Sequence, residues 1–169
     1  IHFRLHGWAE SHFSSYWRNK LETIRTLRRQ IKDKLVARIL AMEPGRALDA
    51  LVAEYVMGLH VEAWSVEPDD PPDYWYVPNS AVRKLDGAEP ERVPNYSTAL
   101  LPAMQVTNRF RHWRMEGRTD LGTVDAALIN EPGQEHWVRS CATVPEAVCK
   151  AALVSLVEAD VLIDKLLEE

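Results

Sequence analysis

Arginine and aromatic residues occur together in two short segments of the C-terminal half, and their chemistry suits ligand binding. If the segment 109–114 is a strand, Arg111 and Trp113 lie on the same face. In the segment 136–139, Trp137 and Arg139 share a face in the same way. Guanidinium groups bind phosphates through charge-assisted hydrogen bonds, and aromatic rings stack on bases. These residues therefore suit a nucleotide-like ligand.

The same residue types have two other interpretations. Trp, Tyr and Arg dominate the hot spots of protein interfaces, so this set also suits a protein partner. The six Trp of the chain can instead fill the core between sheet and helices, with the arginines reaching outward to water. The sequence leaves these three interpretations open.

Motifs that are typical of enzymes are missing from the sequence. It has no Gly-rich phosphate loop, no zinc-binding helix motif and no paired-cysteine metal site. Ser97 lacks the Gly-x-Ser-x-Gly context of a hydrolase nucleophile. Cys141 and Cys149 are eight residues apart, and we expect both to be small core residues. We therefore expect a protein that is not an enzyme and needs no cofactor.

The segment 67–95 has a composition of its own, with six of the ten prolines and seven carboxylates. Long ordered connections are often functional, although an insertion without a task has the same composition. Glu67, Asp69, Asp70 and Asp73 offer oxygen ligands for a divalent cation, but solvated loop carboxylates are far commoner. We predict no metal site.

Charge is unevenly divided along the chain. Residues 1–41 hold nine basic and three acidic side chains, whereas residues 42–169 hold 11 basic and 22 acidic ones. This asymmetry predicts a basic arm on an acidic body. The cations of residues 18–38 suit nucleic acid. They equally suit docking on the chain's own body or on a second copy, and we expect a homo-oligomer.

The basic segment also has a helical pattern of apolar residues. The pattern predicts a helix over residues 17–41 whose single narrow stripe is typical of a coiled-coil seam or of a helix laid across a partner. Pro44 and Gly45 end this helix. The stripe consists of Leu21, Ile24, Leu27, Ile31, Leu35 and Ile39.

The rest of the chain predicts alternating short elements. Helices are expected over 46–58, with Gly58 as C-terminal cap, and over 99–108. A last helix begins after the capping box Thr143–Glu146 and continues through Leu166. No signal peptide and no apolar run long enough for a membrane span are visible, so we expect a cytoplasmic protein without a membrane partner. Strands are expected at 61–66, 74–76, 110–115, 123–129 and 136–142, the last three as an antiparallel meander.

Three segments resemble a known family: residues 47–58 (ALDALVAEYVMG), 93–98 (VPNYST) and 143–153 (TVPEAVCKAAL). Their order and spacing are similar to those of small phage proteins with the phage ABA sandwich domain. The resemblance implies an α+β fold over residues 42–169, a central antiparallel sheet with helices on both faces. Residues 1–41 would then be a basic helical extension. It also implies a phage or prophage protein of an infected bacterium, without an agreed biochemical activity.

We therefore expect a non-enzymatic phage accessory protein that binds a host factor or a nucleotide-like host signal, for instance to sequester it from a host defence. The alternative is a nucleic-acid-binding or oligomerising module that acts through the basic N-terminal helix. The residues expected to bind the ligand are Tyr96, Ser97, Thr98, Arg111, Trp113, Trp137 and Arg139.

Overall fold

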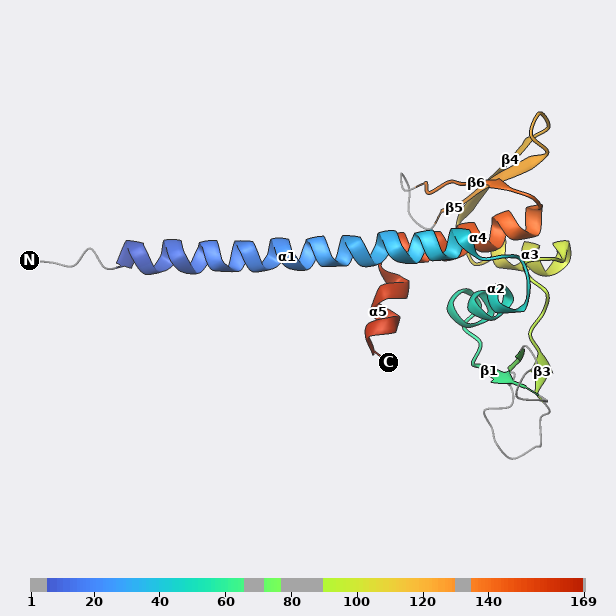
Figure 1. The fold of residues 1–169 in the computed structure, drawn as a ribbon, viewed down its shortest axis with the longest axis horizontal. Helices are drawn as coiled ribbons and strands as arrows, with labels where there is room; N and C mark the ends of the chain where they lie inside the picture. Colours follow the sequence, from blue (N-terminus) through green and yellow to red (C-terminus); the bar gives the residue numbers. More distant parts are fainter. Residues whose placement is uncertain (1–5, 66–71, 77–89, 130–134, 169) are drawn as a thin grey trace, which may run out of the picture.

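The computed structural model describes residues 6–65, 72–76, 90–129 and 135–168, and its elements alternate between helices and short strands (Figure 1). This confirms the predicted α+β class. In chain order the elements are α1 (His6–Ala41), α2 (Arg46–Leu51), the π-helical turn η1 (Val52–Val56), β1 (Val61–Trp64), β2 (Asp73–Tyr76), β3 (Glu91–Arg92), α3 (Leu100–Thr107), β4 (His112–Arg118), β5 (Thr123–Ile129), β6 (Val138–Cys141), α4 (Val144–Glu158) and α5 (Val161–Glu168).

The described strands form two antiparallel sheets of three strands each. One sheet has the order β1-β2-β3, with Val61 opposite Tyr76 and Trp64 opposite Asp73. The other has the order β4-β5-β6, which confirms the predicted meander. The antiparallel character of the predicted fold is therefore confirmed, and the structure adds that β1, β2 and β3 form a sheet of their own.

Helix α4 lies at the centre of the molecule. It packs on β5 and β6 on one side and on α1, α3 and η1 on others. Twelve of its fifteen residues are buried, among them Ala147, Cys149 and Ala151, whose small side chains allow neighbouring elements to approach closely. Its start is the predicted capping box, because the Thr143 hydroxyl accepts a hydrogen bond from the backbone N–H of Glu146 at 3.3 Å.

The prediction of one last helix through Leu166 is wrong. Helix α4 ends at Glu158, and Asp160 adopts a left-handed backbone conformation with φ 63° before α5 begins. Asp is among the few residues that enter this region readily, because its short side chain bonds locally. The Asp160 carboxylate also faces α1, where its Oδ2 lies 3.1 Å from Nζ of Lys32. The chain therefore turns at a residue that α1 holds in place.

Helix α1 is longer than predicted and extends well beyond the rest of the molecule (Figure 1). It begins at His6 rather than near residue 17, and its 36 residues span about 54 Å at 1.5 Å per residue. Its C-terminal end belongs to the core, since Ile39 is buried and Leu35 and Val36 pack against the same cluster. Its N-terminal half projects away from the body.

Candidate functional site

Tyr96 and Ser97, two of the predicted ligand-binding residues, are buried in the core. The Ser97 hydroxyl accepts a hydrogen bond from the backbone N–H of Gly45 at 2.8 Å. The backbone N–H of Ser97 donates to Oδ1 of Asp49 at 2.6 Å. These bonds fasten the segment before α3 to the start of α2, so a ligand at the surface does not meet either side chain. Thr98, the third residue of this motif, is exposed.

Arg46 next to this motif is a connecting residue that was not predicted from the sequence. Its Nε donates to Oδ1 of Asp73 at 2.8 Å, and its guanidinium also donates to the carbonyls of Val93 at 2.7 Å and Tyr74 at 3.1 Å. Arg92 binds the other oxygen of Asp73 at 2.7 Å. Burial acts to raise the pKa of Asp73, but the hydrogen bonds from Tyr74 N–H and from Arg46 outweigh it and lower the pKa. Arg46 thus holds the sheet β1-β2-β3 against α2.

A signal for this role was present in the sequence. Arg46 follows Pro44 and Gly45 directly and therefore falls in the first turn of a helix. A cation is disfavoured there, because the N-terminus of a helix carries a partial positive charge. An arginine at such a position indicates a specific set of acceptors.

The Arg and Trp residues of the sheet β4-β5-β6 lie at its two edges. Arg111 directly precedes β4 and is exposed, and Trp113 within β4 is 47% exposed. Trp137 precedes β6 and is half-buried, and Arg139 within β6 is exposed. Strand β5 separates β4 from β6, so the structure does not gather the two pairs into one cluster.

One ion pair connects the two edges of this sheet. Arg114 of β4 lies 3.0 Å from the Glu135 carboxylate, which precedes β6. A bulge then changes the course of β6, because Ala126 pairs with Val138 and Val124 with Cys141. The buried Asp125 stabilises the bulge by accepting the backbone N–H of Ser140 at 2.8 Å.

The two cysteines are core residues, as predicted. Both are buried and free of disulfide bonding. Burial raises the pKa of Cys141 to about 11, with a further contribution from the charge of Glu146. Burial raises the pKa of Cys149 as well. The thiol rather than the thiolate therefore prevails at neutral pH, which disfavours a nucleophilic role for either residue.

Of the acidic residues considered for a cation, Asp73 is taken up by Arg46 and Arg92, and Glu67, Asp69 and Asp70 lie outside the described residues. In the part of the chain that the structure describes, no three His, Cys, Asp or Glu side chains lie together as metal ligands would. Over the same residues, none of the helices has the length and apolar character that crossing a membrane requires.

Helix α1 carries a line of exposed apolar side chains along its middle, between its projecting end and its docked end, which we call the arm stripe. Each member is between 43% and 53% exposed, although all five are large. Lys20 lies over the ring of the first member, with its Nζ 5.4 Å from the ring centre. The arm stripe consists of Trp17, Leu21, Ile24, Leu27 and Ile31.

The base of the arm is fixed to the acidic body by ion pairs. Nζ of Lys32 donates to the carbonyl of Glu158 at 2.8 Å and lies 3.1 Å from Oδ2 of Asp160. Nε of Arg28 lies 3.1 Å from Oδ1 of Asp160, and its guanidinium also pairs with Asp164. The basic helix therefore docks on its own body at residues 28 and 32.

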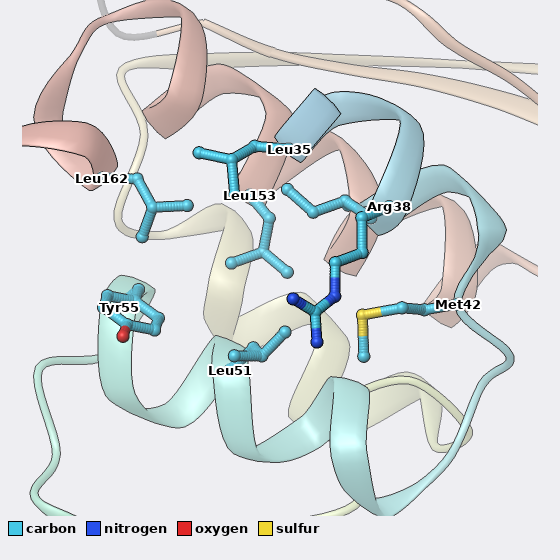
Figure 2. Close-up of a pocket in the computed structure, with 8 residues that line it drawn as sticks. Leu35, Arg38, Met42, Leu51, Tyr55, Leu153 and Leu162 are labelled. Atoms are coloured by element: carbon cyan, nitrogen blue, oxygen red, sulfur yellow. The ribbon is translucent and has the colours of Figure 1, made fainter. Parts of the chain in front are cut away.

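An apolar cavity of about 330 Å³ lies where the arm stripe reaches the body. Leu35 and Ile39, which continue the stripe, form one wall, and Figure 2 shows the guanidinium of Arg38 extending toward Leu51 and Met42. Nζ of Lys165 lies 6.0 Å from the centre of the Tyr55 ring, which also borders the cavity. The lining residues are Leu35, Arg38, Ile39, Met42, Leu51, Tyr55, Leu153 and Leu162. None of the residues predicted from the sequence to bind a ligand lines this cavity.

Among solved structures, the chain is similar to a phage protein from Bacillus cereus ATCC 14579, known from a 2.0 Å crystal structure. The TM-score is 0.50 at 24% identity, over 68% of this chain and 93% of that one. At this identity the similarity concerns the fold alone. No curated protein matches the chain.

The family model of the phage ABA sandwich domain matches residues 50–153, from the end of α2 into α4. The match covers more than half of the chain and includes η1, both sheets and α3. Helix α1 lies outside it. The predicted boundary between residues 41 and 42 stays a prediction. The chain belongs to the phage ABA sandwich domain family.

Proposed function

We propose that this chain is a non-enzymatic phage accessory protein that acts by binding a host factor, and that the arm stripe is the surface it uses. One observation carries the proposal: five large apolar side chains are about half exposed in a line on a projecting helix. Each square ångström of apolar surface left in water costs roughly 25 cal/mol. A contiguous exposed patch of this kind is typical of an interaction site.

The attachment of the arm supports this role. Lys32 and Arg28 bind the end of α4 and the start of α5, and Ile39 is part of the core. The helix is therefore held at its base, and the stripe is presented at a fixed position on the molecule. Because the arm is already ordered, it loses less conformational entropy when a partner binds, and such an arrangement favours binding.

Nucleic-acid binding by the arm is the second candidate. Residues 18–38 hold eight basic and two acidic side chains, a density of positive charge that suits a phosphate backbone. Contacts with phosphates would use these cations and leave the arm stripe in water. Binding of a protein explains both features, so we place it first.

A nucleotide-like host signal stays a proposal for a different surface. Arg111, Trp113 and Arg139 are exposed and offer guanidinium groups and an indole ring for phosphate and base. Calorimetric titration with cyclic nucleotides tests this. Binding that Arg111→Gln weakens would support it, and the absence of heat with every nucleotide would remove it.

Photo-crosslinking in a bacterial host tests the arm proposal directly. Leu21 and Ile24 are replaced one at a time by the photoreactive residue benzoylphenylalanine, and Thr26 serves as the matched control. The Thr26 hydroxyl donates to the carbonyl of Glu22, and Thr26 is exposed about 160° round the helix from Ile24. We expect adducts with a host protein from positions 21 and 24 and none from position 26.

The mass of each adduct decides between the candidates. An adduct with nucleic acid would support the second candidate and overturn the first. Adducts with a second copy alone would show that the stripe serves the predicted homo-oligomer rather than a host factor. If none of the three positions gave an adduct, the arm would not be a binding element.

A further inference from the structure

The arm stripe lies between two rows of cations. At 3.6 residues per turn, Lys20, Lys34 and Arg38 fall along one edge of the stripe. The acidic residues Glu22 and Asp33 fall on the opposite side of the helix, near Thr26. The surface is therefore apolar in its middle and positive along both sides, except at Arg28 and Lys32, whose charges are paired with Asp160 and Asp164 of the body. Along the other edge of the stripe lie Arg18, Arg25 and Arg29.

This charge pattern disfavours a second copy as the occupant. If two α1 helices packed stripe against stripe, the cations beside one stripe would face the cations beside the other. Residues that flank an apolar seam choose the partner through charge, and like charges across it are destabilising. The carboxylates beside the apolar face of an acidic helix would instead pair with the cations along both edges of the stripe.

The shape of the molecule disfavours a flat membrane surface. Leu162 of α5 and Leu35 of α1 line the same cavity, so α5 lies on the side of α1 to which the stripe leads. Helix α5 turns steeply away from α1 there (Figure 1), and its eight residues span about 12 Å. A plane that touched the stripe near Ile31 would meet α5.

We infer that the occupant of the arm stripe is an acidic amphipathic helix of a partner protein, which lies along α1 with one end at the apolar cavity. This inference rests on the proposed function and names the chemistry of the partner. The distance from Trp17 to Ile39 is about 33 Å along the helix, which six turns of a partner helix would match.

The cavity provides an end point for such a helix. Its volume is about 330 Å³, and a cavity of about 150 Å³ already admits benzene, so a leucine or phenylalanine side chain fits. Among the described residues, Arg38 at its border has no ion-pair partner. A carboxylate near the end of the bound helix would supply one.

Two designed peptides test the inference on the full chain. Both are about six turns long with leucine at every a and d position, and they differ only in carrying glutamate or lysine elsewhere. Binding is followed by fluorescence anisotropy of the labelled peptide. We expect the glutamate peptide to bind at least tenfold more tightly than the lysine peptide, with an affinity that falls as salt is added.

Variants of the chain locate the binding surface. Ile24→Asp places a carboxylate in the stripe and should weaken binding of the glutamate peptide at least tenfold. Thr26→Asp introduces the same charge about 160° round the helix from Ile24 and should weaken binding of this peptide less than threefold. Arg38→Gln should weaken it severalfold if the helix ends at the cavity. Both aspartate positions are exposed, and circular dichroism verifies that the variants fold.

The outcomes separate this inference from the proposed function. Equal binding of both peptides, or binding that Ile24→Asp leaves unchanged, would overturn the acidic helix. Two other results would overturn it if the glutamate peptide did not bind. One is association of the chain with anionic phospholipid vesicles, and the other is a dimer in sedimentation that Ile24→Asp dissociates. If crosslinks to a host protein formed at Leu21 while the glutamate peptide failed to bind, the proposed function would stand and the inference would fall. If neither occurred, both would fall.

Discussion

The backbone N–H of Ser97 lies 2.6 Å from Oδ1 of Asp49, and both residues are almost completely buried. This bond joins α2 to the segment before α3 across 48 residues of sequence. Burial raises the pKa of Asp49, and the hydrogen bonds from Ser97 and the charge of Arg46 offset only part of that effect. Ser97, for which a ligand was predicted from the sequence, therefore binds a buried carboxylate of its own chain.

The first prediction concerns the pH dependence of stability at Asp49. Because the pKa of the folded state lies above the ordinary value of 3.8, the folded protein holds the proton more tightly than the unfolded chain. The contribution of the protonated Asp49 carboxyl to the free energy of unfolding is complete below pH 3.8 and is lost as the pH rises through the raised pKa. Asp49→Asn does not titrate, so its stability relative to the parent should increase over this range.

Urea unfolding of the parent and of Asp49→Asn from pH 3.5 to pH 7 measures this difference. Asp120→Asn, at an exposed position in the turn between β4 and β5, is the matched control for the loss of one surface carboxylate. A constant difference for Asp49→Asn would show that its carboxylate has an ordinary pKa.

The second prediction concerns Arg46, which binds Asp73 and two backbone carbonyls. Replacing it by leucine removes one donor from each of these acceptors, although Asp73 keeps Arg92 and the Tyr74 N–H and the Tyr74 carbonyl keeps the Val93 N–H, and should reduce the free energy of unfolding by about 2–3 kcal/mol. Arg46→Lys should recover little, because an ammonium group cannot reproduce the fork of guanidinium donors. Urea unfolding measures both variants. Arg111→Leu, at an exposed position, should change stability by less than about 0.5 kcal/mol. Equal effects at the two arginines would contradict the connecting role.

Elements whose signals are local could be predicted from the sequence. The capping box at Thr143 gave the start of α4, and strand β5 has the predicted bounds 123–129. The stripe of the first helix was also predicted, but its exposed part depends on where the body packs. Only the fold shows that Ile39 is buried while Ile24 is not.

Features that depend on distant contacts could not be predicted. From the sequence, Ser97 is expected to be an accessible polar residue. Its burial follows from contacts with Gly45 and Asp49, which are distant in the sequence. The break after α4 is a further case, since apolar spacing continues through it and Lys32, which holds Asp160, is 128 residues away in the sequence. Arg111, Trp113, Trp137 and Arg139 were proposed for a ligand from residue type and alternation, and neither reports on burial.

The third prediction tests the break at Asp160. Asp160→Ala replaces a residue that enters the left-handed region readily by one that does not, which should reduce the free energy of unfolding by about 1–2 kcal/mol. It also removes the ion pairs with Lys32 and Arg28, which contribute less than about 1 kcal/mol because the carboxylate is partly exposed. Asp160→Asn keeps the backbone preference and loses only the charge, so it should destabilise less than Asp160→Ala in urea unfolding. The reverse order would mean that the ion pairs, and not the backbone, hold the turn.

The fourth prediction compares two isoleucines of the same stripe. Ile39 is buried in the core, so Ile39→Ala should reduce the free energy of unfolding by about 2–5 kcal/mol. Ile24 is half exposed on the projecting arm, and Ile24→Ala should change it by less than about 0.5 kcal/mol. Both substitutions remove the same atoms from the same helix, so helix propensity cancels and the difference reports burial alone. Urea unfolding at several protein concentrations makes the comparison. A large effect at Ile24 that grows with protein concentration would mean that the stripe is covered by a second copy, because only an assembly makes stability depend on concentration.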